Sequence, residues 1–126
     1  MDKTFETGKK LVELCKAGKH LEAIDKLYGP RIVSIEAMEA PQMPRRIEGI
    51  QAVREKGEWW EKSHEIHGGD VEGPWPHGDR FIVRFKHDVT GKGGPMKGKR
   101  MKIDETALYT VKDGKISQAE FFYHMG

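Results

Sequence analysis

The sequence lacks the features of a membrane protein and of a disulfide-stapled protein. No apolar run approaches the ~20 residues that cross a bilayer. Cys15 is the single cysteine, so an internal disulfide cannot form, and residues 1–10 are too polar and charged for a signal peptide. We therefore expect a cytoplasmic protein that does not enter a membrane.

A strong charge of one sign is also missing. The formal net charge is only +2, although 33% of the residues are charged, so the surface is well solvated without a strong field. The densest basic cluster, residues 97–102, lies around a Gly-rich turn and has no interleaved aromatic side chains for base stacking. These features disfavour a nucleic-acid partner.

Metal-ligand spacing does not occur in the sequence. Of the six histidines only His64 and His67 are close together, and on a strand a separation of three residues places them on opposite faces. There is no H-x-x-x-H or multi-cysteine pattern. We expect neither a metal nor a cofactor.

The first half of the chain is mainly helical in pattern. Apolar residues recur at helical spacing in three stretches, and Gly18 and Gly29-Pro30 end the first two. A β-branched stretch lies between the second and the third, followed by a segment with two prolines. The sequence predicts helices over residues 4–17, 20–28 and 49–63, a strand over 31–38, and an irregular loop over 39–48 that is a candidate lid or rim.

The second half alternates with the period of β-strands. Residues 64–72 and 79–88 are predicted strands, separated by a break at Gly73-Pro74. Residues 100–124 surround Asp113-Gly114, the strongest short-range signal for a hairpin. The first arm of this hairpin places one carboxylate on an apolar face, which consists of Met101, Ile103, Glu105, Ala107, Tyr109 and Val111.

Helices followed by a run of antiparallel strands indicate one α+β domain, with a curved sheet and helices packed on one face. That order and the closing VKDGKISQAEFFYH resemble the SnoaL-like branch of the nuclear-transport-factor-2-like superfamily, over nearly the whole chain. The residues that carry the resemblance are packing and turn residues, at positions 28–30, 49–50, 113–116 and 121–123.

The resemblance implies a single domain over residues 1–126. In this fold a curved, mostly antiparallel sheet wraps around three N-terminal helices as a conical barrel with an internal pocket. Relatives include ketosteroid isomerase, scytalone dehydratase, limonene-epoxide hydrolase and a polyketide cyclase, alongside members that only bind other proteins, so the fold leaves the function open. It also implies a homodimer through the outer sheet face, where Ile82 and Leu108 are expected.

Three polar residues are the candidates for catalysis. Glu105 lies on the apolar face described above, and burial among aromatic side chains suits a carboxylate for general acid–base chemistry. His87 ends an apolar stripe on a matching face and is its candidate proton partner. In the last strand either residue parity can face inward, and a bulge would exchange them. We favour Ile116 and Glu120 inward, which makes Glu120 the third candidate.

Aromatic side chains are expected to form the walls of the pocket. Tyr109 is the candidate hydrogen-bond donor to a negative charge that develops on a ligand oxygen. Two alternatives remain open. Glu105 could pair with Arg84 or Lys102 at a sheet edge, and the whole protein could be a non-catalytic ligand-binding or dimeric module. The leading hypothesis is acid–base chemistry on a small apolar, cyclic molecule, as in isomerases, cyclases or hydrolases. The predicted pocket residues are Trp59, Trp60, Phe85, Tyr109, Phe122 and His124.

Overall fold

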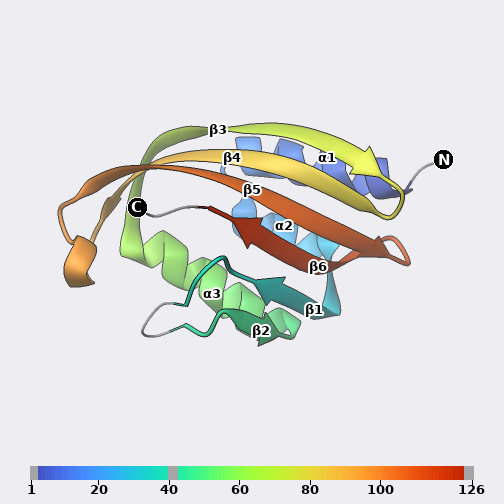
Figure 1. Ribbon diagram of the computed structural model, residues 1–126, viewed down its shortest axis with the longest axis horizontal. Coiled ribbons are helices and arrows are strands. Elements are labelled where there is room, and N and C mark those ends of the chain that lie inside the picture. Colours follow the sequence, from blue (N-terminus) through green and yellow to red (C-terminus); the bar gives the residue numbers. More distant parts are fainter. Residues whose placement is uncertain (1–2, 40–42, 124–126) are drawn as a thin grey trace.

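The protein is described by a computed structural model that covers residues 3–39 and 43–123. Within these residues, three α-helices pack against one six-stranded sheet (Figure 1). In chain order the elements are α1 (Lys3–Lys16), α2 (His20–Leu27), β1 (Tyr28–Ile35), β2 (Arg46–Glu48), α3 (Ile50–Ser63), β3 (His64–His77), β4 (Arg80–Gly91), the 3-10 turn η1 (Gly94–Met96), β5 (Arg100–Lys112) and β6 (Lys115–Phe122).

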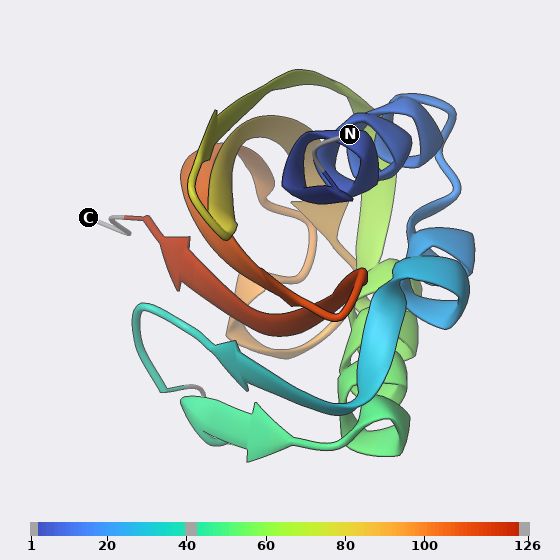
Figure 2. The ribbon, with the colours of Figure 1, turned by 90° about the vertical axis from the view of Figure 1, so that its right-hand side faces the viewer.

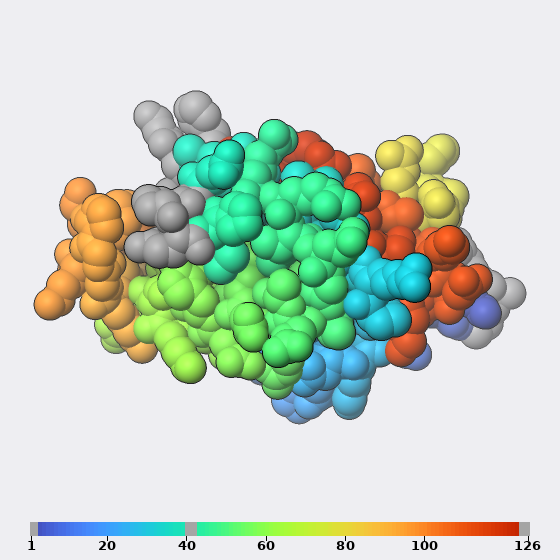
Figure 3. Space-filling model, turned by 90° about the horizontal axis from the view of Figure 1, so that it is seen from below, coloured from blue at the N-terminus to red at the C-terminus, as the bar shows by residue number. Residues whose placement is uncertain are grey.

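The sheet has the strand order β2-β1-β6-β5-β4-β3. All neighbours are antiparallel except β1 and β6, which run parallel. In Figure 2 the sheet curls around α1, while α2 and α3 lie along its open side. Figure 3 shows α3, in green, covering the face seen from below. The α+β class with a curved sheet is therefore confirmed. The sheet does not close into a barrel, because β2 and β3 are its two edge strands and do not pair with each other.

One half of the concave face of the sheet is filled by the helices. Phe81, Val83 and Tyr109 are almost completely buried there, because alternation along β4 and β5 directs them inward. Leu11 of α1 and Ile24 of α2 meet them from the helical side. This cluster is the hydrophobic core, and the other half of the same face is left for a site. None of the helices within residues 3–39 and 43–123 is long and apolar enough to cross a membrane.

The hairpin predicted at Asp113-Gly114 is confirmed. Lys112 pairs with Lys115 across a two-residue turn, and the turn residues have φ values of 53° and 77°. Such left-handed backbone is favourable for glycine and is tolerated by Asp better than by most residues. The turn thereby determines which residues of β5 and β6 face each other.

Three details of the strand prediction are wrong. The strand predicted over residues 31–38 is β1, which begins at Tyr28, includes Gly29-Pro30 and ends at Ile35. The predicted loop over residues 39–48 contains the short strand β2, which pairs with β1 at the edge of the sheet. The predicted break at Gly73-Pro74 does not end β3, which continues to His77. The register shifts between Glu72 and Trp75 instead, because a bulge at a sheet edge accommodates a proline that cannot donate to the ladder.

Of the two residues that we favoured as inward on β6, Ile116 is completely buried, but a bulge after it turns Glu120 outward. Thr110 pairs with Gln118 but Val111 pairs with Ile116, so Ser117 is the extra residue. Its hydroxyl donates a hydrogen bond to the Thr110 carbonyl oxygen at 3.2 Å. Beyond the bulge Ala119 and Phe121 face inward, while Glu120 and Phe122 face outward.

Gly69→Ala is expected to destabilise the fold by at least about 2 kcal/mol. A Cβ atom at residue 69 would lie 2.2 Å from the Lys86 carbonyl oxygen and would push β3 away from β4. Guanidinium chloride unfolding, followed by circular dichroism, measures the loss.

Gly68→Ala is the matched control, because no atom lies within 4 Å of the Cβ position at the adjacent residue. Its free energy of unfolding should stay within about 0.5 kcal/mol of the wild type. Equal losses in the two variants would contradict the close approach of β3 to β4 at this point.

Candidate functional site

A cavity of about 870 Å³ occupies the half of the concave sheet face that the core leaves free. Side chains from all three helices and from five strands line it, and it opens to solvent. Its size is that of a pocket for a drug-sized molecule. Any chemistry of the cavity depends on the polar side chains on its walls.

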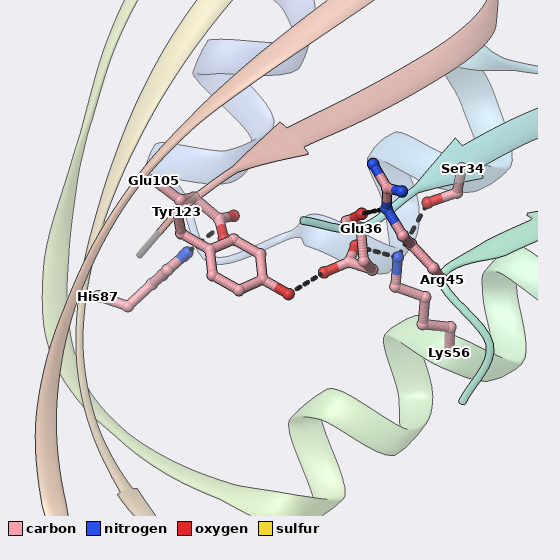
Figure 4. A network of polar contacts seen from close by, with 7 residues as sticks. All are labelled: Ser34, Glu36, Arg45, Lys56, His87, Glu105 and Tyr123. Atoms are coloured by element: carbon pink, nitrogen blue, oxygen red, sulfur yellow. Dashed lines mark hydrogen bonds and ion pairs between the residues drawn. The ribbon is translucent and has the colours of Figure 1, made fainter. Parts of the chain in front are cut away.

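Glu105 and His87 meet on one wall of this cavity. They lie on the adjacent strands β5 and β4, and both side chains point to the concave side (Figure 4). Glu105 Oε1 is 3.5 Å from His87 Nε2, and the two side chains are 17% and 26% exposed. A base and a proton partner are therefore close together and reachable by a ligand.

Aromatic rings surround the His87 imidazole. The Phe85 ring is parallel to it within 9°, with centroids 5.8 Å apart, and the Trp60 centroid lies at 5.6 Å. His64 contacts the same tryptophan, with 3.8 Å between the His64 and Trp60 centroids and 30° between the ring planes. The sequence analysis considered His64 only as a metal ligand, but it lines the cavity from the first residue of β3.

The alternative pairing of Glu105 with a basic residue at the sheet edge does not occur among the described residues. Arg84 instead binds Asp104 through two hydrogen bonds, of 2.9 Å and 2.5 Å, on the outer face of the sheet. Strand alternation separates Asp104 from Glu105, since consecutive side chains point to opposite faces. Glu105 therefore faces the cavity and not the outer surface.

A second polar cluster lies across the cavity and was missed by the sequence analysis. Lys56 of α3 donates to Ser34 Oγ at 2.9 Å and forms an ion pair with Glu36, while the Tyr123 hydroxyl donates to Glu36 Oε1 at 3.0 Å (Figure 4). The Lys56 and Glu36 side chains are only 18% and 19% exposed. A lysine at helical spacing from Val53 and Trp60 was the available signal.

Cys15 and His20 form a third polar contact on the cavity wall, with 3.9 Å between Sγ and Nδ1. Burial lowers the pKa of His20 to about 4, and the charges of His87 and Lys56 act in the same direction. Burial raises the pKa of the Cys15 thiol to about 12. Both groups are therefore neutral near pH 7, and a thiol in this state is a poor nucleophile.

Two tyrosines lie at the end of the cavity next to the core. Burial raises the pKa of Tyr28 and of Tyr109 well above the usual range, so both remain protonated. Among residues 3–39 and 43–123 the Tyr109 hydroxyl has no well-aligned hydrogen-bond partner. The Tyr28 hydroxyl lies beside it, and a hydrogen bond between the two side chains contributes to the raised pKa of Tyr109.

The structure places the predicted pocket residues as follows. Trp59 and Trp60 of α3 line the cavity together with Phe85 and Tyr109. Phe122 was expected to line it but is exposed on the outer face, because of the bulge in β6. The same bulge places Glu120 on the outer face, away from Glu105. The remaining candidate, His124, lies outside the described residues.

Metal ligands do not gather in the part of the chain that the structure describes. No group of three or more His, Cys, Asp or Glu side chains there has the arrangement to hold an ion. Glu105 and His87 form a pair without a third such ligand.

The SnoaL-like domain family matches residues 3–123. The chain belongs to the SnoaL-like family. Its fold also matches the crystal structure of a Mesorhizobium loti protein described as a candidate SnoaL-like polyketide cyclase. The two are 46% identical, the match covers 94% of this chain and 97% of that one, and the TM-score is 0.86.

More distant structures share the fold of this SnoaL-like protein. An NTF2-like protein of unknown function from Burkholderia pseudomallei is 13% identical, with a TM-score of 0.78 and coverage of 98% and 92%. A LEH-like epoxide hydrolase from M. tuberculosis is 13% identical, with a TM-score of 0.67 and coverage of 97% and 83%. A search of curated proteins found no match.

The buried neutral imidazole predicts how stability depends on pH. Since the pKa of His20 falls from 6.5 to about 4 on folding, the unfolded chain binds a proton that the native chain does not. The contribution of neutral His20 to the free energy of unfolding is complete above pH 6.5. It is lost as the pH falls toward 4, and the loss is at most about 3 kcal/mol. Urea unfolding of wild type and His20→Gln at pH 7.5, 5.5 and 4.5 measures it.

The His20→Gln variant should lose less stability than the wild type on acidification, because glutamine does not titrate. His77 is exposed on β3, so His77→Gln serves as the control and should follow the wild-type curve. Identical pH dependence in wild type and His20→Gln would contradict the burial of an uncharged His20.

Proposed function

We propose that this SnoaL-like protein binds a small apolar, cyclic molecule in its cavity and performs acid–base chemistry on it, as an isomerase, cyclase or hydrolase. The observation that carries the proposal is the convergence of Glu105 and His87, 3.5 Å apart, on the wall of an aromatic-lined cavity open to solvent. The family and its named relatives support the reaction class without specifying a substrate.

In the proposed reaction Glu105 acts as the general base. Its carboxylate accepts a proton from a carbon next to a carbonyl group, or from a water molecule that attacks the ligand. His87 exchanges that proton with Glu105 and returns it at a second position, so no net charge is left on the enzyme. The aromatic walls exclude water, which strengthens the interaction of these groups with the ligand.

The negative charge that develops on the ligand oxygen needs a donor. Tyr109 is the candidate, since its hydroxyl stays protonated and it lines the cavity beside Tyr28. Such a donor acts most strongly in a site that water does not reach. Tyr123 lies between Glu36 and Glu105. Its hydroxyl donates a hydrogen bond to Glu36 and so positions the Glu36 carboxylate.

A non-catalytic role is the second candidate, favoured by the outer face of the sheet. Trp75, Ile82 and Leu108 lie in one row across β3, β4 and β5, and the first two are 52% and 38% exposed. An exposed apolar row of this kind is typical of an interaction surface. We propose that it forms a homodimer in a reducing, cytoplasmic setting, which suits the single thiol of Cys15.

A screen of cyclic ketones and epoxides by thermal shift tests the proposed function. Compounds that bind only the folded chain raise its Tm. For any compound that is also converted, Glu105→Gln should keep the Tm shift but lower kcat at least about 100-fold, because the amide cannot accept the proton. The Tm shift and the turnover are measured on the same protein preparations.

Glu13→Gln is the matched control, since Glu13 is exposed on α1 away from the cavity, and it should keep both properties. Binding without turnover by the wild type would favour the non-catalytic role. The proposed function fails if no compound of the screen raises the Tm.

Ile82→Lys is expected to weaken self-association at least about tenfold, because it places a charge in the centre of the apolar row. Sedimentation velocity over a range of protein concentrations measures the dimer. Phe5→Lys is the control, since Phe5 is a similarly exposed apolar residue on α1, and the dimer should remain. A wild-type chain that stays monomeric at every concentration would refute the homodimer.

A further inference from the structure

His20 is a polar residue of the cavity that the proposed chemistry does not use. It is the first residue of α2 and lines the cavity. Its ring lies close enough to His87 and Lys56 for their charges to disfavour its protonation. His20 is therefore a cavity-lining group that feels the charges of both polar clusters.

The contact with Cys15 bears on which ring nitrogen of His20 carries the proton. Cys15 Sγ lies 3.9 Å from His20 Nδ1, and this is the one polar side-chain contact of the ring within residues 3–39 and 43–123. A protonated thiol is a donor, so the arrangement suits a weak S–H···Nδ1 hydrogen bond. The proton of a neutral imidazole is then on Nε2.

Two features of the fold keep the imidazole neutral. His20 begins a helix, and the positive end of the helix dipole disfavours a second positive charge there. The ring is also enclosed by α3, where a Cβ atom on Gly57 would lie 3.9 Å from its Cδ2. Nε2–H is thus an uncharged donor without a protein acceptor among the described residues.

The charges around His20 select the kind of acceptor. Lys56 acts on His20 through its charge, and that charge is balanced by Glu36, which also accepts a hydrogen bond from Tyr123. Glu105 adds a second carboxylate on the opposite wall. Lys16, exposed at the end of α1, and Lys86, which pairs with Glu72, also line the cavity. A carboxylate ligand bound next to His20 would meet Glu36 and Glu105, whereas a carbonyl oxygen needs only the Nε2 proton.

We propose that His20, held by Cys15 as the Nε2–H tautomer, is a further ligand-binding residue that donates a hydrogen bond to an uncharged carbonyl oxygen of the ligand. This inference rests on the proposed function in that the cavity must bind a small molecule. It adds the class of ligand, a neutral cyclic ketone in preference to a carboxylic acid, and the donor that recognises it.

The tautomer is testable on the protein without any ligand. Long-range ¹H–¹⁵N correlation spectra at pH 7 should show His20 in the Nε2–H form, with the resonances assigned by their loss in His20→Gln. Cys15→Ala removes the donor at residue 15 and should give a mixture of the two tautomers. A His20 ring in the Nδ1–H form, or charged at pH 7, would overturn the inference.

Three bicyclic probes of matched shape test the ligand class: 2-decalone, 2-methylenedecalin and decalin-2-carboxylate. Trp59 and Trp60 line the cavity and Trp75 lies on the outer face, so tryptophan fluorescence in a Trp75→Phe background reports binding. The ketone should bind about tenfold more tightly than the methylene compound, the gain of one hydrogen bond. The carboxylate should bind most weakly.

Two variants of His20 provide the matched comparison. The amide nitrogen of glutamine occupies the place of Nε2 and that of asparagine the place of Nδ1, so His20→Gln should keep most of the preference for the ketone and His20→Asn should lose it. Equal preference in both variants, or equal binding of ketone and methylene compound by the wild type, would refute the role of His20 alone. If none of the three probes binds, the proposed function fails with it.

Discussion

The antiparallel pairing of β4 with β5 is the constraint on which the site depends. Its register places Phe81 opposite Tyr109 and Phe85 opposite Glu105, and the pleat directs all four side chains to the concave face. The first pair stacks at 5.0 Å in the core, and the second faces the cavity. A slip of one residue would carry Glu105 to the outer surface and destroy core and site together.

The helices decide where the core ends and the cavity begins. α1 and α2 fill the part of the curved sheet around Phe81 and Tyr109, while α3 contributes Trp60 and Lys56 to the hollow part. Two polar pairs lie in the hollow part: Lys56 forms an ion pair with Glu36, and Glu105 contacts His87. Because buried charges are costly without a partner, this pairing leaves neutral groups such as His20 to recognise a ligand.

Local patterns were sufficient for most elements of the fold. Helical spacing located α1, α2 and α3 to within one or two residues, and Asp113-Gly114 located the β5–β6 hairpin. The same alternation placed Glu105 and His87 on matching faces. These predictions succeed because propensity, periodicity and turn chemistry act between residues that are near in the chain.

Alternation by itself determined that Glu105 shares a face with Tyr109, because side chains on a strand have a period of two. Only the tertiary structure decided which face of β6 meets that side, since one extra residue, Ser117, reverses the parity and turns Glu120 outward. It also decided that Lys56 meets Glu36 and that Cys15 meets His20. Those contacts join separate elements, and their geometry follows from how the helices pack against a bent sheet, which no local pattern encodes.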